Sequence, residues 1–149
     1  MRTLTHPDAL EKYSFVWTEV RLIIAAVSLV IGGFPVVYAL LPIPIFFGLI
    51  RGLLALAWVV SGAASIYLLY RWNKNGQRLF GKKDALDLTA FFIAMISGIN
   101  LGLTGLIGLN IGMAISSNRI VFAIVGLAYI ASAAYLYRRW SESGERMFV

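Results

Sequence analysis

The sequence predicts an all-α integral membrane protein in which four transmembrane helices form two tandem, parallel helical-hairpin repeats. Three observations predict this fold class. The chain of 149 residues is 60% hydrophobic and only 13% charged, its uncharged runs are long enough to cross a bilayer, and one phrase occurs twice. A soluble domain carries about 25% charged residues and about 45–50% apolar ones. A water-soluble fold of this size could not bury so much apolar surface, so the excess is expected to face lipid.

Short interruptions divide the apolar sequence into spans. The run from Leu22 to Ile50 is 29 residues long, whereas one span needs about 20. The sequence LPIP at 41–44 contains two prolines, which remove backbone donors and disfavour the helical conformation of the residues before them. We therefore expect the first helix to end near Leu41 and the second to run from about Ile45 to Tyr70.

The third span is expected over residues 88–108 and the fourth from a cap at Ser117 or Asn118 to about Arg138, with a turn at 109–119. Within the first helix, Gly32, Gly33 and Pro35 indicate a kink. The first apolar stretch is too long for a signal peptide and no small-residue cleavage site follows it.

The basic residues predict the orientation. Ten lie in the two tails and the segment 71–87, against two at the other loops. Under the positive-inside rule, both termini and the linker 71–87 are expected in the cytoplasm, in a plasma membrane of the bacterial type. The ten are Arg2, Lys12, Arg71, Lys74, Arg78, Lys82, Lys83, Arg138, Arg139 and Arg146, and the two opposite ones are Arg51 and Arg119. This asymmetry explains the net charge of +6 better than nucleic-acid binding does.

The phrase YLLYRWNKNGQRLF at 67–80 returns as YLYRRWSESGERMF at 135–148, with seven identities in 14 positions. Aromatic and basic residues suit any helix that leaves a membrane on the cytoplasmic side, but matched glycines and phenylalanines beyond them are not explained in that way. The match predicts duplication of a two-helix hairpin, with repeat 1 over about 14–80 and repeat 2 over about 84–148. Two spans per unit make the repeats parallel, related by a pseudo-twofold axis along the membrane normal.

Each phrase contains a glycine that suits the left-handed cap of a helix, Gly76 in the first and Gly144 in the second. Beyond the caps, residues 78–80 and 146–148 are expected to fold back onto the membrane interface. The interface predicts anionic lipid headgroups as partners. The residues expected there are Arg71, Trp72, Lys74, Arg78, Arg139, Trp140 and Arg146.

The third span is rich in glycine, which allows close approach of another helix. Gly98 and Gly102 form one GxxxG pair, Gly108 and Gly112 form another, and Gly105 shares the face of the first pair. Two interpretations stay open: packing against a helix of the same chain, or a face for self-association into a homo-oligomer or a larger membrane complex.

Ser97, Asn100 and Thr104 follow helical spacing deep in the same span. Polar side chains in a membrane are costly and mark function by default, although many only join helices. They are interhelical hydrogen-bonding groups or the lining of a polar path for an ion or small molecule. We expect no acidic, basic or histidine side chain at this depth, which argues against a proton-coupled site.

Carboxylates are expected at two helix starts, Glu19 on the first helix and Asp87 on the third, where they complement the helix dipole, with Asp84 as a cap. Proton or cation binding is the alternative for Glu19 and Asp87. Arg51 and Arg119 are expected to extend outward to the interface, or to form an anion-attracting ring in an oligomer.

No cofactor and no metal are expected. The chain has no cysteine, and its one histidine, His6, lies in the N-terminal tail. No hydrolase, metalloprotease or phosphate-loop motif occurs, so the protein is not expected to be an enzyme. Two functions remain: a structural, accessory or self-associating membrane subunit, or a small oligomeric channel or transporter with a polar path near Asn100.

Overall fold

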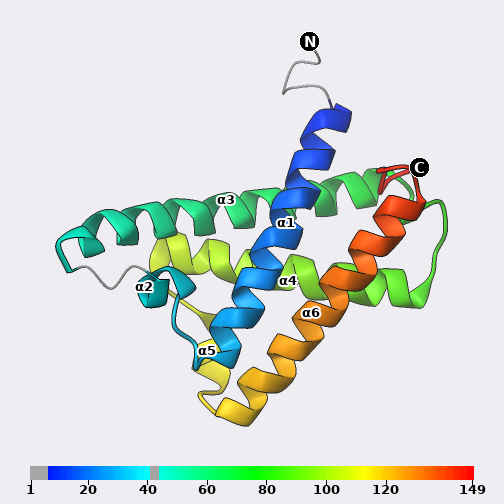
Figure 1. Cartoon of the computed structure of the whole chain (residues 1–149). Coiled ribbons are helices and arrows are strands. Elements are labelled where there is room, and N and C mark those ends of the chain that lie inside the picture. Colours follow the sequence, from blue (N-terminus) through cyan, green and yellow to red (C-terminus); the bar gives the residue numbers. More distant parts are fainter. Residues whose placement is uncertain (1–6, 41–43) are drawn as a thin grey trace.

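The computed structural model describes residues 7–40 and 44–149, and this part of the chain is helical (Figure 1). Among these residues, four helices are long and apolar enough to cross a membrane: α1, α3, α4 and α6. In chain order the elements are α1 (Pro7–Val30), α2 (Val36–Leu40), the 3-10 turn η1 (Pro44–Phe46), α3 (Phe47–Lys74), α4 (Ala85–Ile107), α5 (Ile111–Ile115) and α6 (Arg119–Glu142).

Helix α1 ends at Val30, so the prediction of an end near Leu41 is wrong. Gly32 and Gly33 have φ values of 102° and 87°, which only glycine adopts without strain, and they break the helix instead of kinking it. The backbone N–H of Gly33 donates to the carbonyl of Ser28 at 2.8 Å. The chain then forms the separate short helix α2. Residue 41 itself lies outside the described residues.

Local capping signals set the starts of α4 and α6. The Asp84 carboxylate accepts hydrogen bonds from the backbone N–H groups of Leu86 and Asp87, at 2.8 and 3.2 Å. Asn118 caps α6 in the same way through Ile120, at 2.8 Å. Both predicted caps are confirmed. The expected turn between these helices contains α5.

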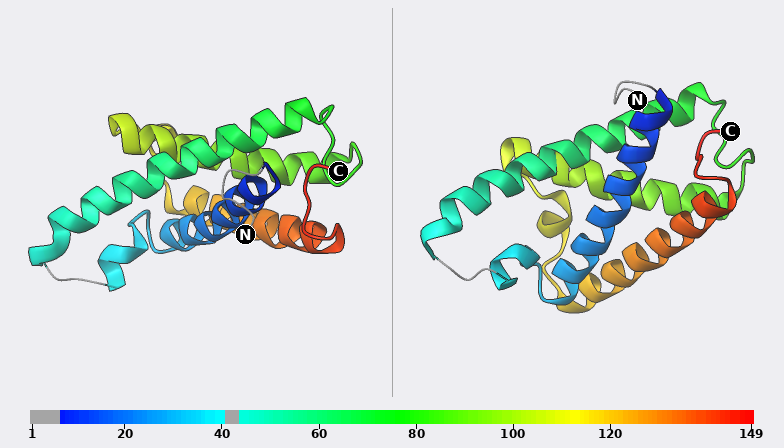
Figure 2. Two further views of the ribbon diagram at one scale, coloured as in Figure 1. Left: turned by 90° about the horizontal axis from the view of Figure 1, so that it is seen from above. Right: turned by 45° about the horizontal axis from the view of Figure 1, so that its top comes forward.

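The long helices form two antiparallel pairs, and glycine makes the contacts inside each pair (Figures 1 and 2). In the α3/α4 pair, a Cβ placed on Gly102 would lie 2.8 Å from the Cα of Gly62. A Cβ on Gly105 would lie 2.7 Å from the carbonyl oxygen of Ala55. In the α1/α6 pair, a Cβ on Gly126 would lie 3.2 Å from the Ala26 carbonyl oxygen. The backbones of each pair therefore touch.

The two pairs meet at one end of the molecule and diverge toward the other, with α2 and α5 between the diverging ends (Figure 2). We call the first end, where α1 and α4 begin and α3 and α6 end, the charged end. The other is the opposite end. Most of the apolar core lies toward the charged end, around Phe15, Leu68, Phe91 and Leu136.

The two copies of the repeated phrase close their helices in the same way. Gly76 and Gly144 have φ values of 65° and 69°, so the predicted left-handed caps are confirmed. The chain then folds back into the core instead of lying on the surface, because Leu79 and Met147 are fully buried. The N–H of Phe80 donates to the Met147 carbonyl at 2.8 Å, so the two phrases also contact one another.

Candidate functional site

Polar side chains join the two helix pairs from the charged end to the middle of the bundle. We call this set of contacts the polar seam. It contrasts with the glycine contacts, which lie within each pair. The residues of the polar seam are Glu11, Trp17, Arg21, Ser61, Arg71, Asp87, Ala94, Ser97, Tyr135 and Arg139.

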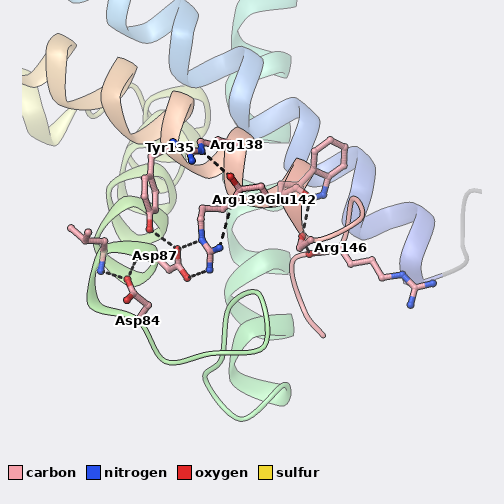
Figure 3. Close-up of polar contacts among 10 residues, drawn as sticks. Asp84, Asp87, Tyr135, Arg138, Arg139, Glu142 and Arg146 are labelled. Carbon is pink, nitrogen blue, oxygen red and sulfur yellow. Dashed lines mark hydrogen bonds and ion pairs between the residues drawn. The ribbon is translucent and has the colours of Figure 1, made fainter.

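Asp87 forms the first part of the polar seam, at the charged end (Figure 3). Its side chain is 0% exposed, in the first turn of α4 as predicted. Arg139 of α6 donates to both carboxylate oxygens, at 2.9 and 3.0 Å, and the Tyr135 hydroxyl donates to Oδ1 at 2.9 Å. Such a bidentate, charge-assisted contact fixes the α3/α4 pair to the α1/α6 pair.

Glu11 forms the second part, and sequence reasoning missed it. Its carboxylate accepts a hydrogen bond from Arg71 of α3 at 2.8 Å and from the backbone N–H groups of Met147 and Phe148, at 3.0 and 3.3 Å. Arg71 and Arg139 occupy matching positions of the repeated phrase, and each binds a carboxylate of the other helix pair. The available signal was therefore the repeat itself.

Several residues expected at lipid headgroups instead contact protein. Arg71 and Arg139 make the ion pairs above, and Trp140, 5% exposed, packs against Phe15 with ring centroids 5.0 Å apart. Trp72 is half-buried and packs edge-on against Phe92 at 5.1 Å. Lys74, Arg78 and Arg146 are exposed.

The innermost part of the polar seam is Arg21. Its guanidinium donates to Ser97 Oγ at 3.0 Å and to the Ala94 carbonyl at 2.9 Å, near the midpoint of α4. The expectation that no charge lies at the depth of Ser97 is therefore wrong. The count of basic residues on the two sides of the membrane left out only Arg21. The available signal in the sequence was the spacing of Trp17 and Arg21, which are one helical turn apart. In the structure Trp17 donates to Ser61 Oγ at 3.0 Å.

Glu19 does not lie at the start of its helix, because α1 already begins at Pro7. Its side chain is 6% exposed, in the middle of the helix. The dipole argument for Glu19 is therefore wrong, whereas Asp87 does lie in a first turn.

Asn100 and Thr104 hold α5 against α4. The Asn100 amide donates to Asn110 Oδ1 at 3.0 Å and accepts from the N–H of Ile111 at 2.8 Å. Thr104 Oγ1 donates to the Asn100 carbonyl at 2.9 Å. Of the three residues of the predicted polar path, only Ser97 therefore belongs to the polar seam.

The five glycines that the sequence predicted to pack against another helix also fall into separate groups. Gly98, Gly102 and Gly105 face α3 of the same chain, and Gly108 is the left-handed cap of α4 with φ 72°. Gly112 lies in α5, where a Cβ would approach only Asn110 and Asn100. The glycine face of α4 is thus covered by α3.

Several buried polar atoms near the inner end of the polar seam have no hydrogen-bond partner among the described residues. They are Thr18 Oγ1, Glu19 Oε1, Arg21 Nε and Ser65 Oγ. A Cβ placed on Gly98 would lie 1.9 Å from Ser65 Oγ and 3.0 Å from Arg21 Nη2, so the hydroxyl and the guanidinium lie side by side above Gly98. Buried polar groups without partners are rare and call for a ligand, water or ion.

Replacing Gly98 by alanine should lower the free energy of unfolding by about 1–2 kcal/mol, because the new methyl group occupies the space of the Ser65 hydroxyl. Chemical unfolding in mixed micelles measures the loss. Ser65→Ala in the same chain should restore most of it, and Gly52→Ala, where nothing lies within 4 Å, should cost little. A double variant no more stable than Gly98→Ala alone would contradict the contact.

The remaining candidates lie apart from the polar seam. Arg51 and Arg119 are exposed near the starts of α3 and α6, where the two pairs diverge. The described residues contain no group of three His, Cys, Asp or Glu side chains that could hold a metal ion.

No protein-family model, curated protein or solved structure matches this chain. Its class is therefore defined by its own fold: the described residues are helical, with four long apolar helices, glycine contacts inside two helix pairs and a polar seam between the pairs.

Proposed function

We propose that the four long helices cross a membrane of the bacterial plasma-membrane type, with the charged end and both termini in the cytoplasm. The distribution of basic residues supports this orientation. The exposed Lys74, Arg78 and Arg146 are available to anionic lipid headgroups. Labelling of single introduced cysteines at the exposed Asn73 and Ser141, which precede the two caps, tests the orientation, and reagent access from opposite faces would contradict it.

The two hairpins arose by tandem duplication in this proposal. The matching caps at Gly76 and Gly144, and the matching ion pairs of Arg71 and Arg139, support it. In this proposal one hairpin contains α1 and α3, and the other contains α4 and α6. A pseudo-twofold axis along the membrane normal that exchanges the hairpins would bring the α3/α4 pair onto the α1/α6 pair. Parallel repeats of this kind occur in transporters.

The function we propose is transport of a small polar or charged solute between the two helix pairs. One observation carries it: polar contacts join the pairs from the charged end to the middle of the bundle, and the pairs diverge toward the opposite end. An ionisable residue at the middle of a membrane span is a functional-site hypothesis by default. We therefore propose a polar path near Arg21 and not near Asn100, where the sequence predicted it.

The contacts suggest how such a path would open alternately to the two sides. Glycine contacts hold each pair together as one body, whereas the ion pairs of Glu11 and Asp87 connect the two bodies at the charged end. Breaking these ion pairs would let the bodies rock about the middle of the bundle. In alternating-access transporters, rigid helix bundles usually rock around a fixed central binding site.

A reversible cross-link tests this motion, since the native chain has no cysteine. Glu11→Cys with Arg71→Cys connects the two pairs, and Lys12→Cys with Glu145→Cys connects positions within the α1/α6 pair. In proteoliposomes, a short cleavable thiol cross-linker should stop solute flux in the first double variant and not in the second. Reductant should restore the flux. Equal inhibition of both, or no flux of any small solute by the wild type, would refute transport.

A second candidate is a structural or accessory subunit that associates with itself or with a larger membrane complex. The observation that favours it is the apolar surface at the opposite end, where Ile45 and Ile115 are 84% and 80% exposed. Native mass spectrometry in lipid discs tests it. A single-chain mass with no co-purifying protein, together with flux, would reject this candidate.

A further inference from the structure

Glu19 is a carboxylate in the apolar part of α1. Its residue is 6% exposed, and it shares a face of the helix with Phe15 and Leu22, which are both fully buried. This face packs on α6, since the Phe15 ring contacts the ring of Trp140. Glu19 Oε1 has no hydrogen-bond partner among the described residues. A carboxylate buried in this way is unfavourable unless an opposite charge or a proton neutralises it.

The repeat provides a comparison for Glu19, because Asp87 occupies the matching position of the second half. Asp87 forms an ion pair with Arg139 of the repeated phrase. In the first half the matching arginine, Arg71, binds Glu11 instead. Within residues 7–40 and 44–149, no basic side chain forms an ion pair with Glu19. The first half therefore keeps the buried acid without the direct partner that its counterpart has.

Arg21 acts on Glu19 through electrostatic attraction and not through a direct ion pair. It is the charged group that acts on the Glu19 carboxylate in the described part of the chain, and Tyr129 of α6 acts on Arg21 in turn. Around the guanidinium, α3 and α4 contribute the uncharged hydroxyls of Ser65 and Ser97. An ionised Glu19 therefore balances the charge of Arg21, and the middle of the bundle then carries no net charge.

We infer that Glu19 binds and releases a proton in the middle of the bundle, and that this proton is the ion coupled to transport. The proton comes from water, forms an O–H bond with a carboxylate oxygen of Glu19, and returns to water when that bond breaks. A proton needs no cavity, and acidic side chains inside membrane spans serve proton relays in pumps and transporters. The inference rests on the proposed transport function and deepens it.

Protonation of Glu19 changes the charge balance between the helix pairs. When Glu19 is neutral, Arg21 is left as an uncompensated cation, which is unfavourable until water reaches the guanidinium. Arg21 donates to Ser97 and to the Ala94 carbonyl of the other helix pair, so water reaches it where the two pairs separate. Protonation should therefore favour the separated arrangement of the pairs, and release of the proton should favour the packed one.

Infrared difference spectroscopy of the purified full-length chain in lipid discs tests the proton site without any assay of flux. A pH titration should show the carbonyl band of a protonated carboxyl group. Glu19→Gln should remove one component of this band, and Glu19→Asp should restore a component at a shifted frequency. The exposed Glu145→Gln is the control and should keep the Glu19 component. An identical band in the wild type and Glu19→Gln would overturn the inference.

Thiol labelling tests the coupling of the proton to separation of the pairs. Ser61, 1% exposed, lies in the polar seam, and Ser61→Cys is labelled with a water-soluble reagent in chains with Glu19 or with Glu19→Gln. On the alkaline side of the infrared titration, the neutral Glu19→Gln should label about tenfold faster, within the usual range of coupling between a bound ligand and a conformational change. On the acidic side the two rates should be equal.

The exposed Ser141→Cys is the control for labelling, and it should react at the same rate with Glu19 and with Glu19→Gln at every pH. Equal rates of Ser61→Cys in both chains throughout the titration would refute the coupling. A Glu19 carboxyl band without flux of any small solute in proteoliposomes would refute transport and leave the proton site standing. Flux without that band would refute the inference and leave transport standing.

Discussion

Asp87→Ala should lower the free energy of unfolding by about 3–5 kcal/mol, the largest loss expected for any ion pair in this protein. The Asp87 side chain is fully buried and holds both Arg139 and Tyr135. Without it, a guanidinium and a phenol remain between the helix pairs without an acceptor. The first turn of α4 also loses a carboxylate that complements the helix dipole.

Unfolding in mixed micelles, followed by helical circular dichroism, measures this loss. Arg138→Gln is the matched control, because the ion pair of Arg138 with Glu142 lies on the surface and its loss should change the free energy of unfolding little. Arg139→Ala should be nearly as harmful as Asp87→Ala, and the double variant should cost less than the two losses together. Equal losses in Asp87→Ala and Arg138→Gln would contradict the role of Asp87 between the pairs.

The two halves of the chain use the repeated arginine differently. Arg139 binds Asp87, which aligns with Glu19 in the first half, but Arg71 binds Glu11, two turns earlier on α1. Glu11 also holds the backbone of Met147 and Phe148, so the C-terminal segment occupies the first ion-pair site. This arrangement leaves Glu19 without the arginine that its counterpart has.

Signals that act within a few residues were readable from the sequence. Asp84 and Asn118 cap their helices, and Gly76 and Gly144 end theirs, because side-chain and backbone geometry at these positions depends on near neighbours. The break at Gly33 was recognised as an irregularity but not as a helix end. Whether a glycine pair bends or stops a helix depends on what packs beside it.

Contacts between distant helices were not readable in the same way. The spacing of Gly98 and Gly102 predicted a close helix but left its identity open, and α3 of the same chain is that helix. The residue type and position of Trp140 predicted a place at the membrane interface, but its ring packs against Phe15 of α1. Arg21 was missed because its hydropathy places it at a boundary, while its long side chain reaches the middle of α4.

Gly102→Leu should lower the free energy of unfolding by about 3 kcal/mol, because the added side chain would meet backbone and not a movable side chain. A Cβ on Gly102 would already lie 2.8 Å from Gly62 Cα and 3.4 Å from its nitrogen, so α3 and α4 must separate to admit the three further carbon atoms of leucine. Unfolding in mixed micelles measures the loss.

The matched control is Gly52→Leu on α3, where nothing lies within 4 Å of an added Cβ. Native mass spectrometry on both variants separates packing within the chain from packing between chains. If the glycine face of α4 serves only the α3/α4 pair, Gly102→Leu weakens the fold and leaves the mass of any assembly unchanged. A smaller assembly with undiminished stability would place a second copy against α4, and the helix pairs would then not be the moving bodies that the transport proposal requires.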